Sequence, residues 1–144
     1  MDVSEILRSK GTKVITVKPD ERLTTLAHRL RHEKIGAAVV SADGNSIDGI
    51  ISERDIAHGL ASHGAHLAEL HVSDLMTKSV ISCKPGDSIS DISRIMTNRR
   101  IRHLPVKEGA RLVGIVSVGD VVKYRLDELQ MEANVMRDYA IARV

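Results

Sequence analysis

Two serine–aspartate pairs with the same spacing are the residues of this chain best suited to bind a ligand. Ser52 and Asp55 form one pair, and Ser117 and Asp120 form the other. Each pair follows a short β-branched run, which predicts a buried strand that leads directly into a helix. The N–H groups and positive dipole at a helix start favour a phosphate. A carboxylate one turn on can accept hydrogen bonds from both hydroxyls of a ribose, so the pairs are candidate nucleotide contacts.

The same spacing also has an interpretation that needs no ligand. Ser-x-x-Asp at a helix start reads as a capping box, in which the two side chains bond to N–H groups of the first turn. The residues alone leave both interpretations open. The copies differ inside the motif, because Glu53 and Arg54 of the first become Val118 and Gly119 in the second. We therefore expect two clefts that differ in affinity or ligand.

Both pairs belong to a unit that occurs twice in the chain. Residues 49–56 return 65 residues later as residues 114–121, and residues 14–19 match residues 80–85 at an offset of 66. One residue is lost in the polar stretch at 43–46, where a turn tolerates a deletion. Two copies are too few for a solenoid. We therefore expect one α+β body made of two halves related by a pseudo-twofold axis.

Hydrophobic periodicity predicts the same plan in both copies, which is strand, helix, strand, strand, helix. The expected strands are at 14–17, 37–40 and 47–51 in the first copy, and at 80–83, 104–106 and 112–116 in the second. A helix is expected from Leu23, with Asp20 and Glu21 as acidic residues for its first turn. Its counterpart is expected to have Asp87 as its N-cap.

The final helix, expected from about Val118 toward Tyr139, has an apolar seam of coiled-coil spacing. The seam consists of Leu126, Leu129, Ala133, Met136 and Ala140. It lasts only about two heptads, and a helix with so short a seam is not stable alone in water. It must pack either on its own body or on a second copy of the chain, and the spacing leaves both arrangements open.

Composition argues against several functional classes. The formal net charge is only +2, and the chain has no Trp, no Phe and two Tyr. It therefore lacks an aromatic platform for single-stranded bases. The chain opens on acidic Asp2 and Glu5 and has no long apolar run, which predicts a cytoplasmic protein without a membrane segment. The single Cys83 is expected to be a packed thiol.

No catalytic or metal-binding constellation stands out in the sequence. His58, His63, His66 and His71 lie close together, but their spacing matches no compact zinc motif. We interpret residues 62–71 as a solvated linker between the repeats. No glycine-rich phosphate loop or nucleophile motif is present, so we predict no catalytic residues and no metal.

These motifs resemble the CBS domain, named after cystathionine β-synthase. The resemblance rests on the doubled Gly-hydrophobic-hydrophobic-Ser-x-x-Asp motif, on the Lys-Pro after each first strand, and on residues 102–106 (RHLPV). It covers roughly residues 3–124. It implies a tandem pair, or Bateman module, with repeats at 1–71 and 72–144. In relatives the clefts of such pairs often bind AMP, ADP, ATP, S-adenosylmethionine or NAD.

The resemblance and the residue types together indicate which side chains would contact such a ligand. Asp55 and Asp120 are the ribose candidates, Arg54 would meet the phosphate end in one cleft, and Arg102, His103 or Lys84 would do so in the other. Aliphatic side chains would hold the adenine. The full set is Lys13, Thr16, Val17, Ala37, Ala38, Ser52, Arg54, Asp55, Ser82, Lys84, Arg102, His103, Leu104, Pro105, Ser117 and Asp120.

The predicted function is a non-enzymatic sensor module. Its regulatory ligand would be an adenine nucleotide (AMP, ADP or ATP) or NAD(H), with no cofactor required. Its predicted partners are a second copy of the chain, as a homodimer, and an unidentified regulated protein. The alternatives are a dimerisation scaffold that binds no ligand, and a weak nucleic-acid binder that uses the basic cluster from Arg99 to Arg102.

Overall fold

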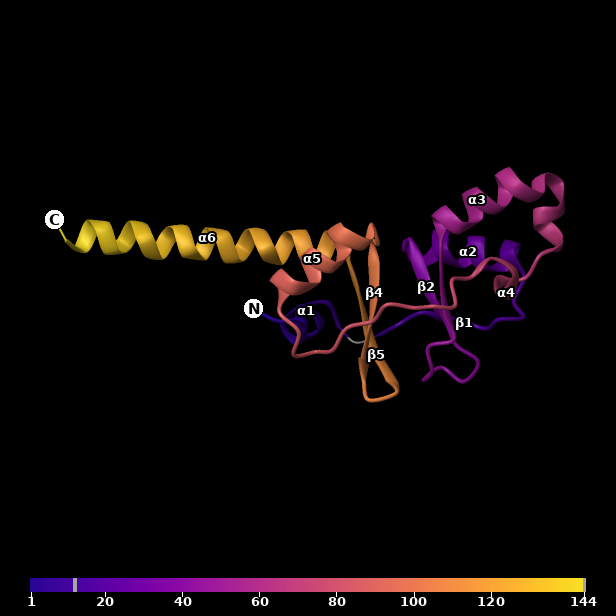
Figure 1. The fold of residues 1–144 in the computed structure, drawn as a ribbon, viewed down its shortest axis with the longest axis horizontal. Coiled ribbons are helices and arrows are strands. Elements are labelled where there is room, and N and C mark those ends of the chain that lie inside the picture. The colour runs from indigo at the N-terminus through magenta and orange to yellow at the C-terminus, as the bar shows by residue number, and fades with distance from the viewer. Residues whose placement is uncertain (12, 144) are drawn as a thin grey trace.

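The computed structural model describes residues 1–11 and 13–143, and its elements follow the predicted order in the first half and repeat it in the second half without the first strand (Figure 1). The first half contains α1 (Val3–Lys10), β1 (Thr16–Val17), α2 (Leu23–Glu33), β2 (Ala37–Val40), β3 (Gly49–Ser52), α3 (Glu53–His63) and the 3-10 helix η1 (Gly64–Glu69). The second half contains α4 (Val72–Leu75), α5 (Ile89–Arg99), β4 (His103–Glu108), β5 (Arg111–Ser117) and α6 (Val118–Ala142).

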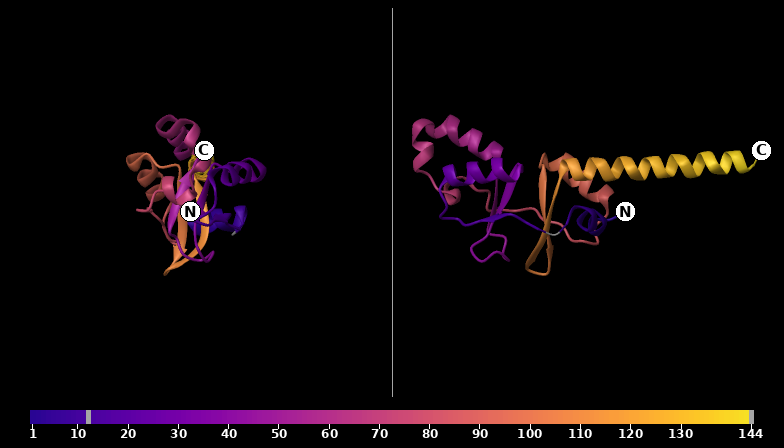
Figure 2. Two further views of the ribbon diagram at one scale, coloured as in Figure 1. Left: turned by 90° about the vertical axis from the view of Figure 1, so that its right-hand side faces the viewer. Right: turned by 180° about the vertical axis from the view of Figure 1, so that it is seen from behind.

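The two halves form two small sheets that lie next to each other along the length of the molecule (Figure 1, and the right-hand view of Figure 2). In the first, β1 runs parallel to β2 and β2 runs antiparallel to β3. In the second, β4 and β5 form an antiparallel hairpin. The α+β class and the repeated plan that the sequence predicts are confirmed.

The predicted strand at 80–83 is wrong, because only Cys83 pairs with its neighbour, in one parallel bridge to Val106. Proline explains the short ladder. The Pro105 carbonyl accepts a hydrogen bond from the Cys83 N–H at 2.9 Å, but proline has no N–H to donate to the carbonyl that would come next in a parallel ladder. Its counterpart Val39 has that N–H, and there the pairing continues as β1 and β2.

Two helix starts differ from the sequence-based expectation. The N-cap of α5 is Ser88, whose hydroxyl accepts from the Asp91 N–H at 3.0 Å, while Asp87 instead accepts from the Lys84 N–H at 2.9 Å. The α2 helix starts after Arg22 with no acidic residue in its first turn. A capping side chain must lie at the residue directly before the first helical turn, where it can accept from an N–H group of that turn. A side chain one residue earlier accepts from an N–H group of the preceding turn instead.

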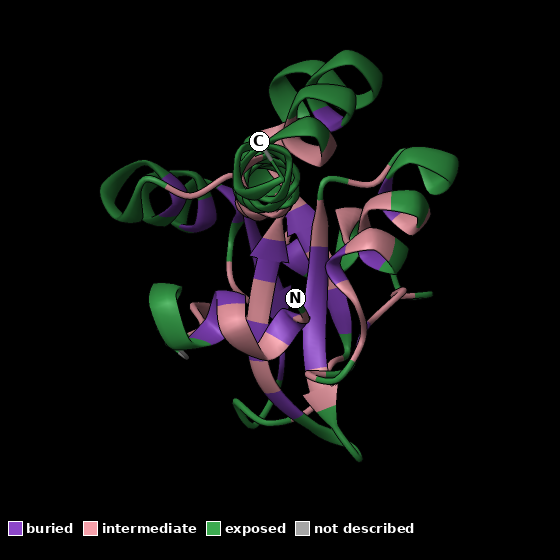
Figure 3. Cartoon of the chain, turned by 90° about the vertical axis from the view of Figure 1, so that its left-hand side faces the viewer, coloured by how far each residue is buried: buried purple, intermediate pink, exposed green. Residues whose placement is uncertain are grey.

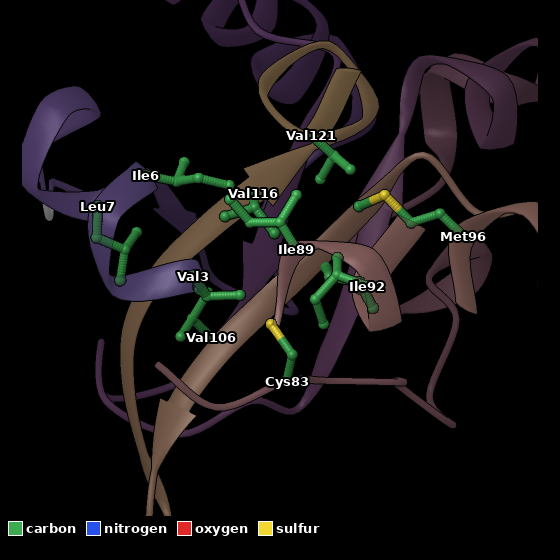
Figure 4. Close-up of a cluster of buried hydrophobic side chains, with 11 residues drawn as sticks. Val3, Ile6, Leu7, Cys83, Ile89, Ile92, Met96, Val106, Val116 and Val121 are labelled. Atoms are coloured by element: carbon green, nitrogen blue, oxygen red, sulfur yellow. The ribbon is translucent and has the colours of Figure 1, made fainter. Parts of the chain in front are cut away.

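The first helix of each half, α1 or α4, which we call its lead-in helix, packs in the hydrophobic core of the other half. The second core contains Val3, Ile6 and Leu7 of α1, packed against β4, β5 and α5 (Figure 4). The first core reciprocally contains Val72 of α4, with Leu75 packed against it. The boundary predicted between residues 71 and 72 therefore does not separate the two cores.

Backbone hydrogen bonds fix this exchange in the same way on both sides. The Val3 N–H donates to the Asp87 carbonyl at 3.0 Å, and the Val72 N–H donates to the Glu21 carbonyl at 2.8 Å. Glu21 and Asp87 occupy the same position of the repeat. The contacts obey the pseudo-twofold relation that the duplication predicts.

The C-terminal helix α6 leaves the body and extends away from it (Figure 1). Val121 is buried and Tyr124 packs against the second core, but Leu126, Leu129 and Met136 are 61%, 46% and 71% exposed. Most residues of α6 are exposed, and Figure 3 shows its visible turns end-on in the colour of exposed residues. Of the two arrangements left open by the sequence, packing of the seam on its own body is excluded.

The stretch between the repeats is more structured than a solvated linker. It continues α3 into η1, and Leu67 and Leu70 pack against the first core. Its histidines His58, His63 and His66 are exposed. Within residues 1–11 and 13–143, no helix is both long enough and apolar enough to cross a bilayer.

Candidate functional site

Two adjoining cavities open where the halves meet. The first, which we call the Asp55 cavity, has a volume of about 250 Å³ and is lined by residues 36–37, 50, 52–55, 77, 79–81 and 100–103. The second, the α5–α6 cavity, has a volume of about 630 Å³ and is lined by residues 54, 96, 100–103 and 117–119. Residues 54 and 100–103 form the boundary that both cavities share.

Seven of the ligand contacts predicted from the sequence line these cavities. Six of them line the Asp55 cavity, namely Ala37, Ser52, Arg54, Asp55, Arg102 and His103. Ser117 lines the α5–α6 cavity together with Arg54, Arg102 and His103. These residues come from both halves, so the cavities exist only when the two repeats are packed together.

The other predicted contacts lie elsewhere, and strand alternation accounts for three of them, namely Val17, Ala38 and Leu104. Val17 and Ala38 belong to the first core, Leu104 belongs to the second core, and Pro105 is buried. Successive side chains of a strand point to opposite faces, so Ala37 reaches the cavity while Ala38 faces the core. Lys13 and Lys84 are exposed, Thr16 and Ser82 are half-buried, and Asp120 lines neither cavity.

Some lining residues were not predicted as ligand contacts. They are Gly36, Ile50, Glu53, Thr77, Ser79, Val80, Ile101 and Arg100 in the Asp55 cavity. Arg100 is the most informative of them, because it also lines the second cavity. The signal for it was its place in the basic run before strand β4, which helix-dipole stabilisation also explains.

Both serine–aspartate pairs form capping boxes. The Ser52 N–H donates to Asp55 Oδ2 at 2.8 Å, and the Ser117 N–H donates to Asp120 Oδ2 at 2.9 Å. The serine hydroxyls accept from the Asp55 and Asp120 N–H groups at 3.4 and 3.2 Å. Among the described residues, no group donates to Oδ1 of either carboxylate. Capping therefore uses one oxygen of each aspartate and leaves the other for a ligand.

The start of α3 is a weaker phosphate site than its sequence suggests. The Glu53 N–H donates to the Gly36 carbonyl at 3.0 Å, and the Asp55 N–H is bonded to Ser52. Two of the first three N–H groups of the helix are thus satisfied inside the protein, which reduces what they can offer an anion. A phosphate in this cavity would need side-chain cations.

Three arginines supply such cations at the boundary of the two cavities. Arg54, Arg100 and Arg102 line both cavities and are exposed. None of the three forms an ion pair within the part of the chain that the structure describes. Guanidinium groups suit phosphate oxygens because they donate in a planar fork. The boundary is therefore prepared for an anionic group.

His103 sits at this boundary beside Gly36, where a Cβ atom would lie 3.4 Å from the His103 ring. Burial is the main cause that lowers the pKa of His103, and the nearby Lys10 and Arg102 lower it further, against Asp120 and Glu53, which raise it. The imidazole is therefore biased toward its neutral form. A neutral ring can accept or donate one hydrogen bond to a ligand.

Asp120 has one partner that Asp55 lacks. Lys10 of α1 donates from Nζ to Asp120 Oδ2 at 2.7 Å and to the Ile115 carbonyl at 3.0 Å. Burial acts to raise the pKa of Asp120, but the hydrogen bonds from Lys10 and Ser117 outweigh it, and the net effect lowers that pKa. The second carboxylate is therefore held as an anion by a cation of the protein itself.

Comparisons with known proteins agree with this arrangement of two repeats. A family model for the CBS domain matches the chain twice, at residues 3–62 and 72–127. The CBS domain-containing protein YhcV of Bacillus subtilis (strain 168) is 31% identical over 119 residues, which are 83% of this chain and 84% of that protein. The crystal structure of the CBS-domain containing protein ATU1752 from Agrobacterium tumefaciens is 44% identical, with a TM-score of 0.83, over 87% of this chain and 99% of that one.

Two more distant solved structures contain ligands. The CBS domain pair of protein MJ0100 was solved in complex with 5′-methylthioadenosine and S-adenosyl-L-methionine, and is 24% identical with a TM-score of 0.76 over 86% of this chain and 98% of that one. CBSX2 was solved in complex with AMP, and is 22% identical with a TM-score of 0.76 over 88% of this chain and 97% of that one. At these identities the likeness shows the fold alone.

Proposed function

The chain belongs to the CBS domain family as a tandem pair, and we propose that it is a regulatory module that binds one class of ligand, an adenosine bearing phosphate, between its repeats. AMP, ADP, ATP and NAD(H) all fit this description. The proposal involves binding without chemical conversion of the ligand, and no cofactor. Its other parts are a homodimer and a regulated protein that reads the ligand-bound state.

One observation carries the proposal. The Asp55 cavity combines a capping carboxylate, an aliphatic wall and arginines that form no ion pair with other described residues, within one space of about 250 Å³. The carboxylate suits a ribose diol, Ile50, Val80 and Ile81 suit the faces of an adenine, and Arg54 and Arg100 suit a phosphate. These three kinds of group match the three parts of a nucleotide, which are base, ribose and phosphate.

The ligands of two distant neighbours support the adenosine part of the proposal. MJ0100 and CBSX2 were crystallised with methylthioadenosine, S-adenosyl-L-methionine or AMP. The arginines of this chain distinguish among these ligands on physical grounds. Three cations favour the negatively charged phosphate of AMP over the sulfonium of S-adenosyl-L-methionine, because like charges at close range repel.

Regulation would follow from the position of the cavity between the halves. A ligand that contacts Asp55 of one repeat and Arg100 of the other binds best when the two repeats are packed as in this structure. It therefore shifts the population toward that packing by its difference in affinity for the two states. A partner protein that contacts both halves would detect the shift.

A thermal-shift panel with AMP, ATP, NAD, adenosine and S-adenosyl-L-methionine tests the proposal. Ligand at a hundred times its dissociation constant should stabilise the folded state by about 2.7 kcal/mol. We expect AMP, ATP or NAD to raise the melting temperature more than adenosine, and S-adenosyl-L-methionine to do least. Absence of any shift with all five compounds would overturn the proposal in favour of a ligand-free scaffold. A salt-sensitive affinity for RNA or DNA that AMP does not affect would favour a nucleic-acid binder.

The homodimer is proposed to form along the exposed seam of α6. Val122, Leu126, Leu129, Ala133 and Met136 recur every three or four residues, so they lie on one face of the helix. A stripe of this kind on a helix that leaves the body is poorly stable in water. A second copy offers an identical stripe of the same length.

Charges beside the seam favour a parallel pair of helices. In a parallel pair, Glu132 lies opposite Arg137 of the second copy, because these residues hold the g and following e positions of the heptad. In an antiparallel pair with matched apolar layers, Glu132 would face Glu132 of the second copy, and Lys123 would face its Arg137. The parallel arrangement makes opposite-charge contacts, whereas the antiparallel one makes like-charge contacts, so the seam selects a parallel dimer.

A further inference from the structure

The two repeats differ at the carboxylates that the duplication makes equivalent. Within residues 1–11 and 13–143, the Asp55 side chain is bonded only to its own capping serine, whereas Asp120 also accepts from the Lys10 ammonium at 2.7 Å. Ile50 lines the Asp55 cavity, and its carbonyl accepts a hydrogen bond from the Thr77 N–H at 2.9 Å. The carbonyl of its counterpart Ile115 accepts a hydrogen bond from Lys10 Nζ at 3.0 Å. Lys10 thus bonds to both Asp120 and the Ile115 carbonyl, whereas among the described residues no cation bonds to Asp55, which lines an open cavity.

An additional turn of helix brings Lys10 to this place. The equivalent lead-in helices are α1 and α4, but α1 spans Val3–Lys10 and α4 ends at Leu75. Leu7 of α1 and Met76 after α4 pack in the same way, against Gly114 and Gly49, where an added Cβ would lie 2.6 and 2.8 Å from their side chains. The helix axis is therefore fixed equally in both repeats, and only α1 continues far enough to present a cation.

We infer that Lys10 is an internal latch that closes the second adenosine site, so that each chain binds one ligand, at Asp55. This inference rests on the proposed function and assigns it a stoichiometry. A ribose diol that approaches Asp120 must replace the hydrogen bonds from Lys10 to Asp120 and Ile115. The charge-assisted bond alone corresponds to roughly a ten- to hundredfold loss of affinity at the second site relative to an unlatched carboxylate.

The latch is a reversible contact rather than a permanent block. The Lys10 and Asp120 side chains are 36% and 25% exposed, so water reaches the ion pair and salt screens it. Removing the ammonium while keeping the length of the side chain should therefore open the second site without disturbing the fold. Lys10→Met is such a change, because methionine is a good helix former of similar length.

Isothermal titration with AMP and, in parallel, S-adenosyl-L-methionine tests the inference. The wild-type chain should bind one AMP, and Asp55→Asn should weaken that binding at least tenfold. Lys10→Met should bind a second AMP, at least tenfold more tightly than any second binding event of the wild type. Asp120→Asn added to Lys10→Met should remove the second site again. Arg8→Met is the matched control, because Arg8 is an exposed cation of the same helix with no contact to Asp120, and it should bind one AMP.

The outcomes separate this inference from the function on which it rests. A wild type with two sites of equal affinity overturns the latch, and so does a Lys10→Met variant that still binds one ligand. Both results leave the adenosine site itself intact. If neither the wild type nor Lys10→Met binds either compound at Asp55 or Asp120, the proposed function fails and the latch fails with it. Circular dichroism of each variant establishes that it is folded.

Discussion

Lys34 and Arg100 occupy the same position in the two repeats and share a backbone conformation that side chains rarely adopt. Each ends the helix before the second strand of its repeat, with a φ of 55° for Lys34 and 53° for Arg100. Glycine usually holds such left-handed positions, because other residues crowd their Cβ atoms there. Arg100 lines both cavities and Lys34 lines neither. Substitutions at the two positions can therefore distinguish an effect on backbone strain, which both residues share, from an effect on ligand binding, which only Arg100 can have.

Replacing each of these residues with glycine should stabilise the fold. Relief of the left-handed strain in Lys34→Gly and Arg100→Gly should add about 0.5–1 kcal/mol to the free energy of unfolding, measured by urea denaturation. Only Arg100→Gly removes a cation from the cavities, so it alone should weaken AMP binding, by roughly tenfold, while adenosine binding changes little. Equal losses of AMP affinity in both variants would show that Arg100 does not contact the phosphate.

The two aspartates should respond differently to the same substitution. Asparagine keeps an oxygen for the capping box, so both Asp55→Asn and Asp120→Asn should remain folded. Asp55→Asn removes the charge from the open cavity and should weaken AMP binding roughly ten- to hundredfold. Asp120→Asn in the wild-type background should change it less than about threefold, because Lys10 already holds that carboxylate. Titration calorimetry on the two variants gives the comparison, and a larger effect at Asp120 would contradict it.

Protonation of His103 should destabilise the protein in mild acid. The pKa of His103 in the folded state is lowered below its ordinary value of 6.5, chiefly by burial, so the unfolded chain binds more protons between these two values. Stability contributed by neutral His103 is complete above about pH 6.5 and is lost as the pH falls toward the lowered pKa. Asp120, whose pKa is lowered from 3.8, acts only in stronger acid.

Urea denaturation at pH 7.5 and pH 5.5 measures this effect. His103→Gln keeps a polar side chain that does not titrate, so the wild type should lose more stability than the variant over this interval. The comparison cancels the contributions of the exposed histidines, which both proteins share. An equal loss in the two proteins would show that His103 is protonated as easily in the folded chain as in the unfolded one.

The seam of α6 should control the oligomeric state. Leu129→Glu places a charge in the centre of the seam and should convert a dimer into a monomer in sedimentation equilibrium. Met131→Glu is the matched control, because Met131 is 59% exposed and lies roughly 200° around the helix from Leu129. A monomeric wild type, or equal effects of both variants, would contradict dimerisation through this seam.

The direction of the dimer can be read from a charge exchange. Glu132→Arg should weaken a parallel dimer by about 0.2–0.5 kcal/mol per ion pair lost, and more where like charges then meet. Adding Arg137→Glu to the same chain restores opposite charges across a parallel interface and should recover the dimer. An antiparallel pair would not be rescued in this way.

The sequence was sufficient to predict features that depend on local patterns. The repeat and the β2 strand at 37–40 follow from sequence patterns, because burial selects the same apolar residues that the pattern marks. The predictions failed where one residue changes the local balance. Pro105 shortens a strand that β-branched residues favour, and Ser88 caps a helix in place of Asp87.

The candidate site was predictable only in part, for a similar reason. Ser52, Asp55, Arg54 and His103 line the Asp55 cavity as their motifs suggested. The face of a strand depends on register, so the choice between Ala37 and Ala38 needed the structure. The contact of Lys10 with Asp120 joins residues 110 positions apart, and no local pattern in the sequence marks it.

The exchange of lead-in helices has a consequence for how this molecule can be divided. α1 completes the second core and α4 completes the first. Cleavage between residues 71 and 72 therefore gives two fragments, each of which exposes an apolar groove and carries the helix that fills the groove of the other. When the two fragments are mixed, they should reassemble by exchanging these helices. An ancestral protein with a single repeat would have had to dimerise to complete its core, and fusion of two copies of its gene would have made that association covalent.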